Sequence, residues 1–165
     1  MILAGSGHRL GPIYHGVLKR ELRHFARDFL TKNEATLAIS GMAIGWDQAL
    51  ALAAIDLKIP FYAVMPFPGM EKKWQPDMQA EFHWIRERAE DQITVAPEFS
   101  LAAYQARNER MVDLSEAVLA LWDGRKHGGT HNCLLYAHKR GRRVHHLWQD
   151  WQDRAKDTLR AGWQS

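Results

Sequence analysis

The hydrophobic pattern alternates between two periods along most of the chain. Short apolar runs with the length of buried strands lie at residues 2–4, 37–40, 60–65, 93–95, 117–122 and 143–147. The stretches between them show helical spacing, and the first repeats apolar residues at steps of four, three and four, at Leu18, Leu22, Phe25 and Phe29. The run at 60–65 is apolar on both alternations, which is typical of a strand covered on both faces.

Helix start and stop residues agree with this division. We expect helices at residues 12–33, 46–58, 74–89, 100–113 and 132–140, and a last amphipathic helix after residue 147. Pro12 suits a first helical turn, Ser100 suits an N-cap and Gly141 stands at a usual C-cap position. Alternating strands and helices predict an α/β fold, with a single domain built on a mainly parallel sheet that carries helices on both faces.

The composition narrows the class of protein further. With 165 residues, 46% of them apolar and 25% charged, the chain is typical of one soluble globular domain. No run approaches the ~20 apolar residues of a membrane span, and no signal peptide is recognisable. Cys133 is the single cysteine, so no intrachain disulfide can form and we expect a reducing, cytoplasmic location without a membrane partner. The net charge of +3 and the scattered arginines do not favour nucleic acid as a partner.

Three glycine-containing loops follow predicted strands, at residues 5–9, 40–47 and 124–130. In a parallel sheet these loops share one edge, where such proteins bind ligands. A glycine turn that leads into a helix presents backbone N–H groups to an anion such as phosphate. We expect Gly41 and Gly45 to take positive φ and to let a ligand approach the backbone closely. The alternative is that these glycines only turn the chain.

Four motifs occur here in the same order as in the SLOG superfamily, which includes the DNA-processing protein DprA and the cytokinin-activating LOG enzymes. They are AGSGHR at 4–9, SGMAIGWD at 40–47, RN at 107–108 ahead of MVD at 111–113, and WDG at 122–124 with GGT at 128–130. Over roughly residues 1–147 the chain resembles this superfamily and is most similar to the YspA/YpsA-like branch, and residues 148–165 are expected to form a C-terminal helical tail. The resemblance implies a Rossmann-like fold that holds a nucleotide or a nucleotide-derived phosphorylated ligand.

The resemblance to LOG enzymes also implies roles for particular residues. In those enzymes a glycine–threonine loop holds the phosphate of a nucleoside monophosphate, and an arginine and a glutamate help to cleave the N-glycosidic bond. Arg107 matches that arginine, and residues 128–130 match part of the loop. The glutamate has no counterpart, because residues 131–135 carry no carboxylate, and Asn108 stands where LOG enzymes carry a lysine. The usual acid–base partner for glycosidic cleavage is therefore missing.

The candidate ligand-binding residues come from the three loops and from the predicted helix 100–113. They are Gly5, Ser6, Gly7, His8, Arg9, Ser40, Gly41, Gly45, Asp47, Arg107, Asn108, Gly128, Gly129 and Thr130. Arg107 either forks onto a phosphate or is an exposed helix arginine. Asp47 either benefits from a helix N-terminus or contacts a ribose hydroxyl or acts as a base. Asp123 either is a functional carboxylate at a strand end or forms a turn. The candidate catalytic residues are Arg107, Asp47 and Asp123.

Three functions fit these residues. The favoured one is a module that senses or sequesters a nucleotide; the alternatives are a LOG-like N-glycosidase (phosphoribohydrolase) on nucleoside monophosphates and DprA-like binding of single-stranded DNA. No cysteine or carboxylate spacing supports a metal site at His8, His127 and His131, so we expect neither a metal nor a cofactor. We expect a homo-oligomer, and the tail tryptophans either serve its interface or cover an edge of the core. Cys133 is expected to be buried and inert.

Overall fold

The computed structural model, which describes residues 1–9 and 17–164, is built on one parallel sheet. Its strands are β1 (Ile2–Gly7), β2 (Leu37–Ser40), β3 (Phe61–Met65), β4 (Asp91–Thr94), β5 (Ala117–Leu121) and β6 (Arg143–His146). They lie in the order β4-β3-β2-β1-β5-β6, and every neighbouring pair is parallel. The predicted α/β class is confirmed, and within the described residues the sheet is entirely rather than mainly parallel.

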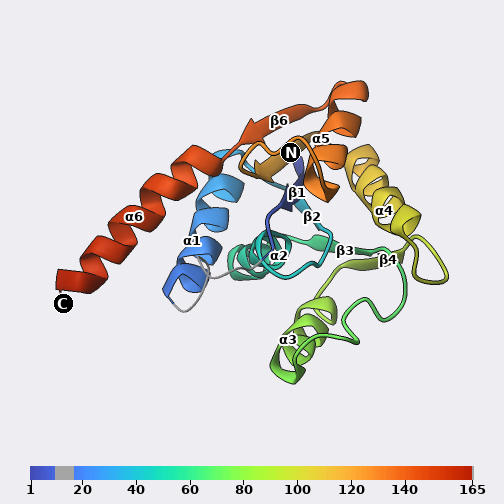
Figure 1. The fold of residues 1–165 in the computed structure, drawn as a ribbon, viewed down its shortest axis with the longest axis horizontal. Helices are drawn as coiled ribbons and strands as arrows, with labels where there is room; N and C mark the ends of the chain where they lie inside the picture. The colour runs from blue at the N-terminus through green and yellow to red at the C-terminus, as the bar shows by residue number, and fades with distance from the viewer. Residues whose placement is uncertain (10–16, 165) are drawn as a thin grey trace.

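Helices cover both faces of this sheet (Figure 1). They are α1 (Val17–Lys32), α2 (Trp46–Leu57), α3 (Pro76–Arg86), α4 (Leu101–Leu114), α5 (Gly129–Lys139) and α6 (Trp148–Gln164). Leu3 of β1 belongs to the core beneath α1, α2, α3 and α6, whereas the next residue, Ala4, packs with Met111 of α4. On that second face Val118 of β5 packs with Cys133 of α5. Burial on both sides explains why β2, β3 and β5 are nearly continuous apolar runs, whereas the edge strands β4 and β6 are more exposed and more polar.

The order of the strands reverses at β1. From β1 the chain steps outward through β2, β3 and β4, and it then returns to add β5 and β6 on the other side of β1. β1 and β5 pair from Leu3 opposite Ala117 to Gly7 opposite Leu121, so their carboxyl ends lie side by side. In doubly wound sheets this point of reversal leaves a crevice in which ligands bind.

Most predicted boundaries agree with the structure within two residues, and three do not. β1 continues through residues 5–7, because these pair with residues 119–121 of β5, so the first three residues of the predicted glycine loop 5–9 are strand. α5 begins at Gly129, three residues before the predicted start, and α3 ends at Arg86, three residues before the predicted end. The predicted helix start at Pro12 lies outside the described residues.

The C-terminal helix α6 begins against the core and then extends past α1 to the far end of the molecule (Figure 1). Trp151 is only 1% exposed and lies in the main core, which is the covering role predicted for the tail tryptophans. Arg154 forms ion pairs of 2.5 Å with Glu21 and Asp28 of α1. The side chain of Trp163 lies outside the described residues.

Glycine is required at position 7 of β1 because both the neighbouring strand β5 and the helix α2 approach the strand closely there. A Cβ atom on Gly7 would lie 2.6 Å from the backbone oxygen of Leu121 and 2.8 Å from Cδ1 of the buried Trp46. Neither group can move aside easily, and overpacking of this kind costs about 1–3 kcal/mol. We expect Gly7→Ala to lower the free energy of unfolding by about 2 kcal/mol in urea titrations.

Gly129 offers a matched control for that substitution. A Cβ on Gly129 meets no atom within 4 Å, and the residue opens α5, where alanine is a better helix former. Gly129→Ala is therefore expected to leave the free energy of unfolding unchanged or slightly raised. A similar loss of stability in both variants would contradict the packing explanation for Gly7.

Candidate functional site

A cavity of about 830 Å³ opens at the point where the strand order reverses. Its walls come from the end of β1, the start of α2, one face of α4 and the loop from β5 into α5. The predicted site residues that line it are Gly5, Ser6, Gly7, His8, Arg9, Asp47, Arg107, Asn108, Gly128, Gly129 and Thr130. Ser40, Gly41, Gly45 and Asp123 were also predicted and do not line it.

Arg107 lies on the buried face of α4 and is only 7% exposed, so the alternative interpretation as an exposed helix arginine is wrong. Its Nη1 donates a hydrogen bond to the backbone oxygen of Gly41, and its Nε donates to Oδ1 of Asn108 at 3.0 Å. Burial lowers the pKa of Arg107, and the nearby Asp47 carboxylate opposes that effect. The guanidinium is thus held in place at the cavity wall, with further N–H groups available to a ligand.

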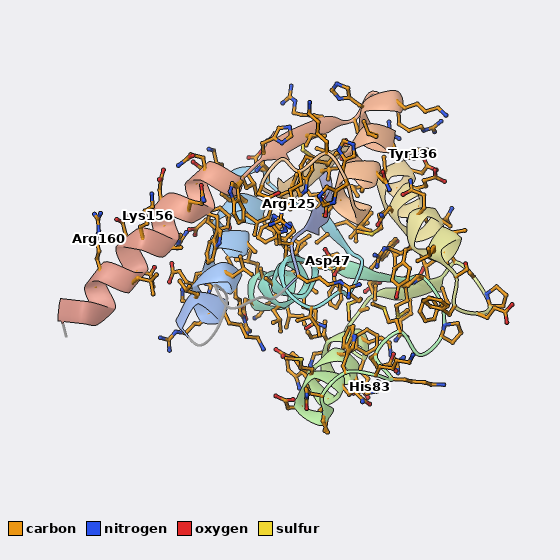
Figure 2. All side chains as sticks on the ribbon, viewed as in Figure 1. Asp47, His83, Arg125, Tyr136, Lys156 and Arg160 are labelled. Carbon is orange, nitrogen blue, oxygen red and sulfur yellow. The ribbon has the colours of Figure 1, made fainter. Side chains whose placement is uncertain are left out.

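Asp47, in the first turn of α2, is the carboxylate that lines the cavity among the described residues, and Figure 2 shows it inside the molecule. It is 7% exposed, and its Oδ2 accepts a hydrogen bond from the Ala43 N–H at 3.4 Å. Burial raises the pKa of Asp47 to about 6, although the positive charge of Arg107 favours the ionised form. A cavity carboxyl group with a strongly raised pKa is a candidate for a functional role.

Gly41 separates these two charged groups, and its role differs from the predicted one. Its φ is not positive; instead a Cβ atom there would lie 2.8 Å from both Nη1 of Arg107 and Oδ2 of Asp47. The neighbouring Met42 takes the left-handed conformation, with φ of 64°, and Gly45 does so as predicted, with φ of 105°. Glycine at position 41 therefore allows the close approach of two charged side chains.

Ser40 shapes the second loop without reaching the cavity. Its buried hydroxyl donates a hydrogen bond to the backbone oxygen of Asp47 at 2.7 Å and accepts one from the Met42 N–H at 3.1 Å. Gly45 lies away from the cavity, in a separate hollow formed with α1. Both residues fix the turn that carries Asp47, so their contribution to a bound ligand is indirect.

The third loop brings the N-terminus of α5 to the cavity. Gly128 is the N-cap with φ of 94°, and no side chain caps the helix. The first turn contains no acidic residue, so its free N–H groups and the positive end of the helix dipole remain available to an anion. Asn108 is tied to this turn, because its Nδ2 donates to the backbone oxygen of Gly129 at 3.2 Å. Arg107 and the start of α5 are thereby linked through one side chain.

Asp123 forms a turn between Trp122 and Arg125, which both line the cavity, but does not line it itself. Its Oδ1 accepts from the Arg125 N–H at 3.1 Å, and its Oδ2 lies 2.6 Å from Nε of Arg125. Burial disfavours the ionised form, but the Arg125 N–H, His8 and the Arg125 side chain outweigh it and lower the pKa of Asp123. The Asp123 N–H donates to Nε2 of His8 at 3.0 Å, and burial lowers the pKa of His8. The arrangement favours a neutral His8 and agrees with the turn interpretation of Asp123.

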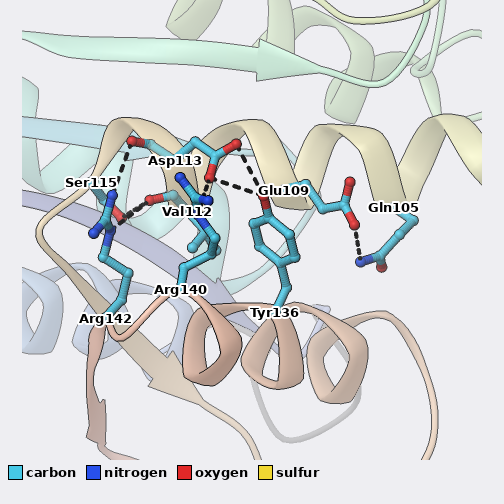
Figure 3. Close-up of polar contacts among 8 residues, drawn as sticks. All are labelled: Gln105, Glu109, Val112, Asp113, Ser115, Tyr136, Arg140 and Arg142. Atoms are coloured by element: carbon cyan, nitrogen blue, oxygen red, sulfur yellow. Dashed lines mark hydrogen bonds and ion pairs between the residues drawn. The ribbon is translucent and has the colours of Figure 1, made fainter.

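Polar contacts on the outer side of α4 and α5 fix the two helices against each other (Figure 3). The Tyr136 hydroxyl donates to Asp113 at 3.0 Å, and Nε of Arg140 lies 3.1 Å from Oδ1 of the same carboxylate. Arg142 adds hydrogen bonds to backbone oxygens at the end of α4. These contacts join α4, which carries Arg107, to α5, whose N-terminus lines the cavity.

Several cavity residues were not predicted from the sequence. They are Phe99, Leu101, Tyr104, Gln105, Met111, Trp122, Arg125, His127, Asn132 and Ala43. Part of this set follows from helical spacing, because residues 101, 104, 108 and 111 share one face of the predicted helix 100–113. Arg125 and His127 carry no such periodic signal, since they lie in an irregular loop.

Cys133 is 2% exposed at the base of α5. The prediction that Cys133 is buried is confirmed. Burial raises the pKa of its thiol to about 11, so a reactive thiolate is not expected near neutral pH. Among the described residues no group of three or more His, Cys, Asp or Glu side chains is arranged to hold a metal ion.

The parallel sheet, its point of reversal and the cavity there define a Rossmann-like α/β protein. Residues 13–148 match the YspA SLOG family, and the chain belongs to this family. The chain is also 34% identical over 149 residues to the uncharacterized SPbeta prophage-derived protein YoqJ of Bacillus subtilis (strain 168), covering 80% of this chain and 86% of YoqJ. The resemblance stated from the four sequence motifs is confirmed.

Solved structures with the same fold include two DNA-processing proteins. DprA from Streptococcus pneumoniae superimposes with a TM-score of 0.63 at 17% identity, over 97% of this chain and 56% of the DprA chain. DprA from Helicobacter pylori, described with a single-stranded DNA binding mode, gives a TM-score of 0.64 at 17% identity, over 98% of this chain and 81% of its own. No helix in the described part of this chain is long and apolar enough to cross a membrane.

Proposed function

We propose that the protein binds a nucleotide or a nucleotide-derived phosphorylated ligand in the cavity at the strand ends, as a sensor or sequestering module. The observation that carries this proposal is the uncapped N-terminus of α5, which opens onto the same cavity as the buried guanidinium of Arg107. A helix N-terminus and a bidentate arginine side chain bind phosphate in two independent ways, and in this protein both groups line one cavity.

The remaining cavity residues suit the rest of such a ligand. Asp47 and Asn108 also line the cavity. The carboxyl group of Asp47 and the side-chain amide of Asn108 can form hydrogen bonds with ribose hydroxyls. The cavity volume of about 830 Å³ is in the range of small-molecule sites. A mononucleotide placed with its phosphate at α5 would therefore find hydrogen-bonding partners along its sugar.

Cleavage of the N-glycosidic bond is a second candidate function, and one observation favours it. Asp47 lines the cavity with a pKa of about 6, a suitable value for a general acid or base near neutral pH. Asp123 is the weaker candidate because it does not line the cavity and is paired with Arg125. Chromatography for free base after incubation with nucleoside 5′-monophosphates separates an enzyme from a binding module.

Binding of single-stranded DNA is a third candidate, favoured by the fold shared with Helicobacter pylori DprA. A protein that neutralises several phosphates loses affinity steeply as the salt concentration rises. A mononucleotide held by one phosphate site loses much less. Affinity for a short oligonucleotide measured over a range of salt concentrations therefore separates this candidate from the proposed one, and native mass spectrometry of the same sample tests the expected homo-oligomer.

The phosphate position can be blocked without disturbing the fold. Thr130 lies in the first turn of α5 and lines the cavity, and a glutamate there is stabilised by the helix dipole. In Thr130→Glu the carboxylate would repel a ligand phosphate by about 1–4 kcal/mol at a separation near 4 Å. We expect calorimetry with nucleoside 5′-monophosphates to show a loss of affinity of roughly 5- to 700-fold, with the melting temperature unchanged or raised.

Thr130→Gln is the matched control, since it adds the same bulk without the charge. We expect it to retain most of the affinity. Equal losses in both variants would indicate simple obstruction, and equal retention in both would overturn the assignment of the phosphate to α5.

A further inference from the structure

Three aromatic rings pack together beside the cavity, and two of them, Phe99 and Tyr104, line it. Phe67 packs edge-to-face against Phe99, with ring centroids 5.4 Å apart, and against Tyr104, at 5.5 Å. Phe99 and Tyr104 also contact each other at 6.4 Å and 79°. Phe67 is buried and belongs to the main core, whereas Phe99 is 66% exposed. The buried ring thus anchors an exposed one at the edge of the cavity.

This cluster is unusually apolar for an exposed surface. Leu101, one turn before Tyr104 on α4, is 81% exposed and lines the cavity together with Phe99 and Tyr104. We call Phe99, Leu101 and Tyr104 the aromatic lip. Edge-to-face contacts fix the positions of its rings, so a planar ligand group can stack there with little further ordering.

The aromatic lip is continuous with the charged part of the cavity. The guanidinium carbon of Arg107 lies 5.9 Å from the ring centroid of Tyr104, and both residues line the cavity. One end of the cavity is therefore cationic and rich in N–H groups, and the other is apolar and aromatic. A nucleoside phosphate matches this arrangement, because its phosphate is anionic and its base is a planar aromatic group.

We propose that the aromatic lip is a stacking site for the base of the ligand, so that the cavity takes nucleoside phosphates in preference to sugar phosphates. This inference rests on the proposed function and adds to it a binding site for the base. Phe99 provides the main stacking face, because it is the exposed ring of the three. Since every base has a π-face, stacking here tolerates different bases and favours the larger purines.

The test compares two ligands that differ only in the presence of a base. Stacking of a base on an aromatic side chain contributes about 1–3 kcal/mol by alanine substitution. We expect Phe99→Ala to weaken binding of adenosine 5′-monophosphate roughly 5- to 100-fold in calorimetry. Binding of ribose 5-phosphate should be unchanged, and Phe99→Trp should restore the affinity for the nucleotide. Leu135→Ala, at an exposed leucine on the outer side of α5, is the control for a surface apolar residue and should change neither.

The other outcomes separate this inference from the proposed function. If the wild-type protein binds both ligands equally and Phe99→Ala changes neither affinity, the stacking site is wrong and the phosphate site stands. If the wild-type protein binds neither ligand, the proposed function fails and the stacking site with it. If Phe99→Ala changes the subunit count in native mass spectrometry while nucleotide affinity stays constant, the lip is a contact between copies of the chain and the inference is overturned.

Discussion

Replacing Arg107 with alanine is expected to weaken nucleotide binding by roughly 100-fold. The guanidinium would form charge-assisted hydrogen bonds to the phosphate, each of which contributes about 1.5–3 kcal/mol. Its N–H groups are already oriented by Gly41 and Asn108, so little ordering is needed when the ligand binds. Loss of this group removes one of the two phosphate-binding elements and leaves only the N-terminus of α5.

The same substitution also affects stability, because Arg107 is buried against polar partners. Without it, the Gly41 carbonyl and the Asn108 amide oxygen each lose a donor, and the Asp47 carboxylate loses its nearby positive charge. Calorimetry should therefore be done well below the melting temperature, after circular dichroism has shown the variant to be folded. Arg107→Lys keeps the charge but not the fork, and we expect intermediate affinity.

Arg110→Ala is the matched control, at an exposed arginine one turn further along α4. We expect it to bind nucleotide like the wild-type protein. Unchanged affinity in a folded Arg107→Ala variant would show that the phosphate lies elsewhere.

Asp47→Asn is expected to stabilise the protein at neutral pH by an amount on the order of 3 kcal/mol. The pKa of Asp47 is about 6 in the folded protein, above the ordinary value of 3.8 that applies when the chain is unfolded. Ionised Asp47 therefore destabilises the fold above pH 6, and this cost disappears as the pH falls from 6 to below 3.8. The increase in the free energy of unfolding caused by Asp47→Asn should be complete at pH 8 and absent at pH 3.5.

Urea titrations between pH 3.5 and pH 8 measure this difference directly. Asp56, on the same helix α2, is a control for which substitution should change the free energy of unfolding in the opposite direction, because its hydrogen bonds to Arg23 lower its pKa. Asp56→Asn should destabilise the protein at pH 7, and the loss should fade as the pH falls through the pKa of Asp56 in the folded state. A loss of stability in Asp47→Asn that is constant with pH would contradict the burial of an ionisable carboxyl at this position.

The sequence pattern predicted the architecture because burial on both faces leaves a clear signal. Runs such as 60–65 and 117–122 are apolar throughout, and the structure places both in interior strands of the sheet, β3 and β5. The pattern could not predict where β1 ends. Residues 5–7 contain two glycines, which are typical of loops, yet they pair with β5 and use the glycines to accommodate Trp46.

The candidate site was predicted in part. Residues at the ends of β1, the start of α2 and the start of α5 were brought together as expected, because parallel strands end at one edge of the sheet. The charge pattern did not reveal that Arg107 and Asp47 are buried on either side of Gly41, since that depends on contacts between segments 60 residues apart. Phe99 escaped prediction because an exposed phenylalanine in a loop carries no periodic signal.

In the proposed function, backbone N–H groups at the start of α5 bind the phosphate of a nucleotide. Nuclear magnetic resonance of the 15N-labelled protein, titrated with adenosine 5′-monophosphate, observes those groups directly. We expect large, saturable shifts of the amide signals of Gly129 and Thr130, with little change at Gly141 beyond the other end of the helix. Saturable shifts confined to other segments, or no shifts at millimolar nucleotide, would contradict it.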